Sequence, residues 1–249
     1  MKKLFTTKNL PWAILALGVL GALCRLWLFS TGVDDKGLLA EGHLAYILLW
    51  AISLAAVGLL LWGTWNLRQA TKYRFNFPSS LLGSLGTAAA GAAVLVYSLT
   101  TLSVPDDGLL ATLSLVGILS AGALGFLSYC RWKGLRPSAL FYMLLCLYFM
   151  LRLVYQYRVW SADPQLQDYL FSLLALVFVL LSCYYSANFA AGEGNRRAHT
   201  FVLLAGVFCC TVALPRCEAP LLYAGMGLWL LTNLCNLTPL HEPRKHKEG

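Results

Sequence analysis

Charged residues are scarce in this chain, and their scarcity indicates the class of protein. Asp, Glu, Lys and Arg together make up 12% of the 249 residues, whereas a soluble domain carries roughly 25%. Hydrophobic residues make up 59% of the sequence, and its mean hydropathy is +0.66. This composition argues against a water-soluble fold, so we expect an integral membrane protein.

Other absences disfavour particular functions. The apolar stretches contain no Lys, which excludes a retinal Schiff base, and no Asp or Glu near their centres, which disfavours carboxylate-coupled ion transport. The H-E-x-x-H motif and the Walker and Rossmann glycine patterns are missing. The eight cysteines include no C-x-x-C pair and no metal-ligand spacing. We therefore expect no cofactor, no metal site and no enzyme activity.

The chain instead contains a series of apolar stretches, at residues 11–30, 43–65, 80–102, 109–130, 138–159, 166–188, 199–214 and 219–237. Most have the ~20 residues that a helix needs to cross a bilayer, and they are too long for barrel strands. The sequence therefore predicts an all-α, polytopic transmembrane bundle of about eight spans, forming one membrane domain over residues 1–249. Stretch 199–214 is the shortest, so seven spans and one re-entrant segment form the alternative; Pro215 and Pro220 separate it from the last stretch.

Basic residues predict how these spans are oriented. With the N-terminus inside, the cytoplasmic segments hold 14 Lys and Arg residues and the opposite loops hold only Lys36 and Arg216. This asymmetry satisfies the positive-inside rule and places both termini in the cytoplasm. The net charge of +8 then reflects orientation in a bacterial inner (plasma) membrane, with the lipid bilayer as partner and no nucleic acid. Trp160, near the predicted outer surface, is assigned to the aromatic belt.

Small residues indicate close packing of two successive spans. Residues 80–102 and 109–130 each carry a four-residue repeat that lines one helix face: Gly83, Thr87 and Gly91 in the first, and Gly117, Ala121 and Gly125 in the second. Such faces let helix backbones approach closely. The short link at 103–107 predicts that the two helices are antiparallel neighbours.

The chain also shows signs of an internal repeat. Arg25 and, later, Arg152 each lie in the outer half of an outgoing span and are followed by an acidic loop and an acid at the start of the returning span. This pattern suggests a duplication into halves 1–130 and 138–249. Halves with an even number of spans have parallel topology.

Intramembrane arginines carry the main chemical signal. Arg25 and Arg152 lie about 8–10 Å below the predicted outer surface at 1.5 Å per residue, and Arg158 lies near that surface. An arginine within a membrane is costly and calls for a partner, for which the nearby acids are candidates. The candidate ligand-binding residues are Arg25, Glu41, His43, Arg152, Tyr155, Gln156, Arg158, Asp163 and Asp168.

Two interpretations of this cluster remain open. In the first, the arginines converge on an outward-side site for a polar or anionic small molecule, and the chain is a small permease or ligand-binding membrane protein. Arginine suits this role because its planar fork donates two bonds to a carboxylate or phosphate. In the second, the arginines are structural ion pairs in a non-catalytic membrane assembly subunit.

Overall fold

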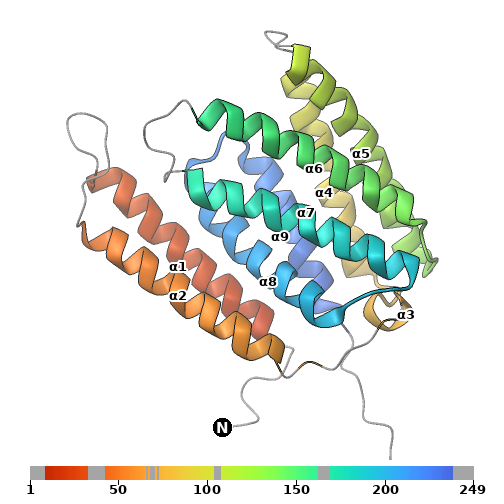
Figure 1. Cartoon of the computed structure of the whole chain (residues 1–249), viewed down its shortest axis with the longest axis horizontal. Helices are drawn as coiled ribbons and strands as arrows, with labels where there is room; N and C mark the ends of the chain where they lie inside the picture. Colours follow the sequence, from red (N-terminus) through yellow and green to blue (C-terminus); the bar gives the residue numbers. More distant parts are fainter. Residues whose placement is uncertain are drawn as a thin grey trace, which may run out of the picture.

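The chain folds into a bundle of helices (Figure 1). The computed structural model describes residues 9–32, 43–65, 67, 71, 73–103, 108–161 and 169–237, and every regular element in these ranges is helical. The α-helices are α1 (Leu10–Thr31), α2 (Leu44–Trp65), α3 (Tyr73–Asn76), α4 (Leu81–Leu102), α5 (Gly108–Lys133), α6 (Ala139–Trp160), α7 (Leu170–Ala191), α8 (Arg196–Ala213) and α9 (Pro220–Cys235).

Seven of these helices have the length and composition of membrane spans: α1, α2 and α4 to α8. The predicted all-helical membrane bundle is therefore supported. Helix α9 has 16 residues, or roughly 24 Å at 1.5 Å per residue, which is shorter than a hydrocarbon core of about 30 Å. The eighth span, the side on which the termini lie and the internal repeat stay predictions.

Local sequence signals set the helix ends. Ser80 and Asn195 cap α4 and α8, because their side chains accept hydrogen bonds from the backbone N–H groups of Gly83 and Ala198. Helix α7 ends at Gly192, whose φ of 105° lies in the left-handed region that glycine adopts without strain. After α8 a short 3-10 turn, Leu214–Arg216, leads to α9. The predicted break between the last two stretches is thus present.

Helix α8 lies at the centre of the bundle. It packs against α1, α2, α7 and α9, and most of its length is buried. Figure 1 shows the α1–α2 pair on one side of α8 and α4 with α5 on the far side of α9. Helix α6 packs between α5 and α7. Stretch 199–214, the shortest of the predicted spans, therefore lies in the helix against which α1, α2, α7 and α9 pack.

The small-residue faces hold two helix pairs together. Helices α4 and α5 are close neighbours, as predicted, and a Cβ at Gly91 would lie 3.2 Å from the Cβ of Leu124 on α5. Gly86, in contrast, faces α9, where an added Cβ would overlap the side chain of Thr232. One face of α4 therefore packs against α5, and another packs against the short helix α9.

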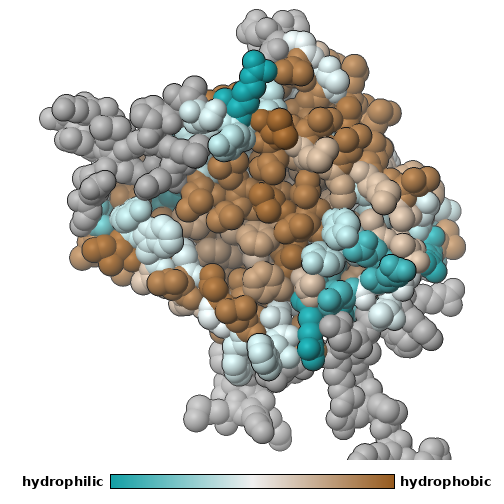
Figure 2. Space-filling model, in the orientation of Figure 1, coloured by the Kyte–Doolittle hydropathy of each residue, from teal (hydrophilic) through white to brown (hydrophobic). Residues whose placement is uncertain are grey.

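The surface of the bundle is apolar over its middle (Figure 2). Large hydrophobic side chains of α1, α2 and α6 are exposed there, as expected for helices in contact with lipid. We call the end that carries Arg131, Lys133, Arg136, Arg196 and Arg197 the basic end. The opposite end contains Trp160 and the turn 214–219 between α8 and α9.

Candidate functional site

A ladder of long side chains lines the buried face of α6. Tyr148, Arg152, Gln156 and Trp160 follow one another at four-residue intervals, so they lie on one helix face. They are 1%, 1%, 2% and 3% exposed, respectively. This ladder extends from the middle of α6 to the opposite end of the bundle. Its side chains reach α4 and the turn before α9.

Arg152 is the central group of the ladder. Its guanidinium carbon lies 4.0 Å from the centre of the Tyr97 ring on α4, a cation–π contact. The hydroxyls of Tyr148 and Tyr223 lie within electrostatic range of the guanidinium. Among the described residues, Nε and Nη2 of Arg152 have no hydrogen-bond partner, although both atoms are buried. The site therefore holds a positive charge with donors available to a further group.

Glu218 closes the ladder at the opposite end of the bundle. It lies in the turn before α9, and its carboxylate accepts hydrogen bonds from Nε2 of Gln156 at 2.8 Å and from Nε1 of Trp160 at 3.0 Å. Gln156 lies one helical turn beyond Arg152 and Trp160 one turn further. Glu218 is itself an exposed residue, and these two hydrogen bonds connect it to the buried side chains at the end of the ladder.

Close packing supports the other side of the ladder. Gly117 of α5 lies against Tyr148 and Ser98, and a Cβ added there would collide with the Ser98 hydroxyl. It would also come within 2.9 Å of the Tyr148 ring. Glycine at this position therefore lets α4, α5 and α6 approach closely enough to position Tyr148 one turn below Arg152.

Arg25 lies in a different environment. Its Nη1 donates a hydrogen bond of 3.1 Å to the backbone carbonyl of Val212, near the end of α8. Its guanidinium also lies 5.5 Å from the ring centre of Phe29 and 5.9 Å from that of Phe171 on α7. Arg25 therefore joins α1 to α7 and α8.

The turn between α8 and α9 lies between these two arginines. Burial raises the pKa of the Cys217 thiol, whereas the backbone N–H of Ala219 and then Arg25 and Arg152 oppose that rise. Both guanidinium groups are therefore within electrostatic range of the same thiol. Arg25 of α1 and Arg152 of α6 are thus both near this turn.

The remaining predicted residues are placed as follows. Arg158 is exposed, and its position six residues after Arg152 puts it on another face of α6. Tyr155 is half-buried. His43 accepts a hydrogen bond from the backbone N–H of Ala45 at 3.3 Å, which fits a role at the start of α2. Glu41, Asp163 and Asp168 lie outside the described residues.

A second polar cluster lies at the basic end. Arg131 of α5 is 6% exposed, donates from Nη1 to Oδ1 of Asn233 on α9, and lies 5.1 Å from the ring centre of Phe77. His199 of α8 is fully buried, and neither ring nitrogen has a hydrogen-bond partner among the described residues. The rings of Phe77 and Phe189 contact the imidazole with their centres 5.5 and 5.3 Å away. Arg131 is one of the 14 basic residues that the sequence places in the predicted cytoplasmic segments, and nothing in the sequence marks its partner on α9.

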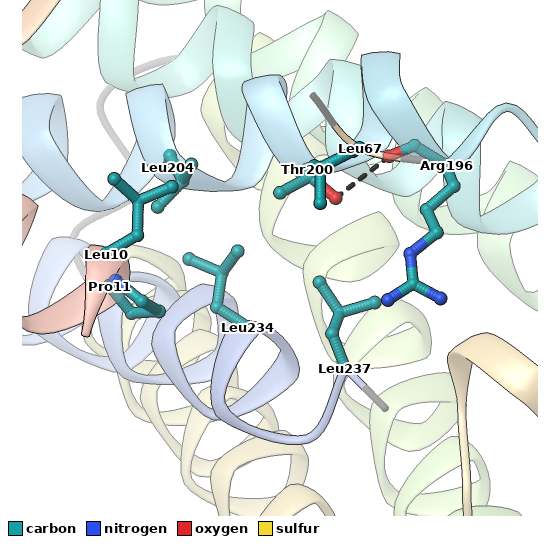
Figure 3. Close-up of a pocket in the computed structure, with 8 residues that line it drawn as sticks. All are labelled: Leu10, Pro11, Leu67, Arg196, Thr200, Leu204, Leu234 and Leu237. Atoms are coloured by element: carbon teal, nitrogen blue, oxygen red, sulfur yellow. Dashed lines mark hydrogen bonds between the residues drawn. The ribbon is translucent and has the colours of Figure 1, made fainter. Parts of the chain in front are cut away.

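Two cavities among the described residues lie at the same end. A small one, of about 20 Å³, has room for about one water molecule and is mostly apolar. Figure 3 shows Arg196 at one side of this cavity and the bond of 2.8 Å from the Thr200 hydroxyl to the Arg196 carbonyl. The second is a more open groove of about 310 Å³ between α2 and α8. Neither cavity is lined by Arg25, Arg152 or Arg158.

Among the described residues, no group of three or more His, Cys, Asp and Glu side chains is placed to hold a metal ion.

No family model, no curated protein and no solved structure matches the chain. The helices define the class of protein, a helical bundle apolar enough for a membrane. A more specific function has to be argued from the geometry of the polar clusters.

Proposed function

We propose that the chain is a ligand-binding protein of the plasma membrane, a small permease, that binds an anionic or polar small molecule through Arg152. The supporting observation is the guanidinium of Arg152, which is 1% exposed and retains two buried donors without a hydrogen-bond partner among the described residues. A buried charge of this kind is costly unless another group pairs with it. A carboxylate or phosphate would accept from the guanidinium in the paired geometry that arginine favours.

The surroundings of Arg152 suit a polar solute. The hydroxyls of Tyr148 and Tyr223 lie near the guanidinium, and hydroxyl groups both donate and accept hydrogen bonds. The ligand enters from the opposite end of the bundle, where the Glu218 bonds to Gln156 and Trp160 must open. While these two bonds are intact, Glu218 covers the buried side chains of Gln156 and Trp160 at that entrance, so breaking the bonds controls access.

Ligand-dependent thermal stability tests the proposal. The purified chain is heated in detergent with increasing inorganic phosphate, lactate or succinate, and we expect at least one of them to raise Tm saturably. A ligand at 100 times its Kd stabilises by about 2.7 kcal/mol. We expect Arg152→Gln to abolish the shift and Arg158→Gln, an exposed arginine of the same helix, to retain it. An equal shift in both variants, or no saturable shift with any probe, contradicts the proposal.

A second function, that of a non-catalytic assembly subunit, is favoured by Arg25. This arginine bonds the Val212 carbonyl and contacts two aromatic rings, which is the behaviour expected of a residue that fixes helix packing. Under this alternative Arg25→Gln and Arg152→Gln both lower the Tm of the chain, and no small anion raises it. The same titrations therefore distinguish the two functions.

A further inference from the structure

The groove between α2 and α8 at the basic end combines an apolar wall with one charged side chain. Its volume is about 310 Å³, and it is open to the surface. Helix α2 contributes Leu61, Thr64 and Trp65, and α8 contributes Arg197, Ala198 and Phe201. Such a lining suits a molecule that has an apolar part and an anionic part.

The indole and the guanidinium that line this groove are both accessible. Trp65 is 80% exposed, and tryptophan favours the headgroup level of a bilayer because its ring is amphipathic. Arg197 is exposed too. Its Nε donates a hydrogen bond to the backbone carbonyl of Leu67, just after α2. That bond fixes the side chain across the groove, and the Nη groups carry the remaining donors of the guanidinium.

We propose that this groove binds one anionic phospholipid, with the phosphate on Arg197 and an acyl chain along Leu61 and Phe201. Charge complementarity identifies the occupant, because Arg197 is the only ionised group among the described residues that line the groove, and it is positive. Basic pockets between helices at the cytoplasmic side of a membrane bind anionic headgroups. This proposal is independent of ligand binding at Arg152, which lies toward the other end of the bundle.

Arg136 provides a matched control. It is also an exposed arginine of the basic end, and its Nε donates to a backbone carbonyl, that of Ala190, at 2.8 Å. It does not line the groove. Substitution of either arginine by glutamine removes one charge from the same end of the protein. Only Arg197→Gln removes a charge from the groove.

Native mass spectrometry of the full chain tests the proposal. Phosphatidylglycerol and phosphatidylcholine with identical acyl chains are added in equal amounts to delipidated protein in detergent. We expect one phosphatidylglycerol to bind in preference to phosphatidylcholine. We expect Arg197→Gln to weaken that binding about tenfold, the loss of roughly one charge-assisted pair, and Arg136→Gln to change it less than twofold.

A second variant keeps the test decisive if Arg197→Gln does not fold. Leu61→Trp adds bulk at a position that is 55% exposed, so it fills the groove without changing the charge. We expect it to reduce phosphatidylglycerol binding while Tm is maintained. Equal binding of the two lipids, equal losses in Arg197→Gln and Arg136→Gln, or displacement of the lipid by millimolar inorganic phosphate would overturn the proposal. The last result would indicate a site for free phosphate.

Discussion

Replacement of Arg152 by methionine tests whether this arginine is held ready for a ligand or holds the fold together. Methionine keeps a long, flexible side chain that fills irregular space in a protein interior. It removes the charge and all the donors of the guanidinium. Because Arg152 is 1% exposed, the substituted side chain stays among Tyr97, Tyr148 and Tyr223 with little new contact with water.

Two opposing effects set the size of the change. Loss of the cation–π contact with Tyr97, at 4.0 Å, costs about 2 kcal/mol for a desolvated pair. Removal of the two buried donors without partners, Nε and Nη2, recovers about 1–3 kcal/mol each. The net effect of Arg152→Met on the unliganded protein therefore lies between no change and roughly 4 kcal/mol of stabilisation.

The assay is thermal unfolding of the purified chain in detergent, with Arg158→Met as the control for loss of one positive charge on α6. One kcal/mol corresponds to about 2–4 °C in a chain of this size. We expect Tm of Arg152→Met to stay constant or rise, while Arg158→Met stays near the wild type. A clear fall in Tm for Arg152→Met alone would refute the reasoning, because it would show that Arg152 stabilises the fold.

Three further predictions concern the packing around the two clusters. Gly117→Ala should destabilise by about 1–3 kcal/mol through overpacking, whereas Gly125→Ala, with open space around its Cβ, should be neutral or slightly stabilising in thermal unfolding. Glu218→Ala should cost about 1 kcal/mol; a double-mutant cycle with Trp160→Phe should give a coupling of at least 0.5 kcal/mol, and additive effects would contradict the hydrogen bond. Asn233→Leu should destabilise by about 1.5–3 kcal/mol because it removes the acceptor of a buried arginine; an unchanged Tm would contradict that contact.

The sequence predicts the long helices well because their signal is local. A run of about 20 apolar residues is sufficient to identify a span, and glycine, proline and polar caps mark its ends. The bounds of α2 and α4 accordingly differ from the predicted 43–65 and 80–102 by one residue at most. The four-residue helix α3 lies between spans, where no apolar run marks it.

Partners across the bundle could not be predicted in the same way. Gln156 and Glu218 are 62 positions apart in the sequence, and only the position of the α8–α9 turn brings them together. Trp160 has the position of an aromatic-belt residue, yet it is 3% exposed and bonded to that carboxylate. The side chain of Trp160 is buried there because Glu218, in the α8–α9 turn, bonds to it at the end of α6. The four-residue spacing of Arg152 and Gln156, in contrast, does predict that the two side chains share one helix face.

The sidedness of the two ends tests the central claim most directly. We would introduce a single cysteine at Arg216 or at Lys133, both exposed, into a chain whose eight native cysteines are replaced. Intact cells are then treated with a membrane-impermeant maleimide. A bundle that spans the membrane with its Arg152 end outward predicts labelling at position 216 in intact cells and at position 133 only after permeabilisation. The reverse pattern, or labelling of both positions in intact cells, would contradict it.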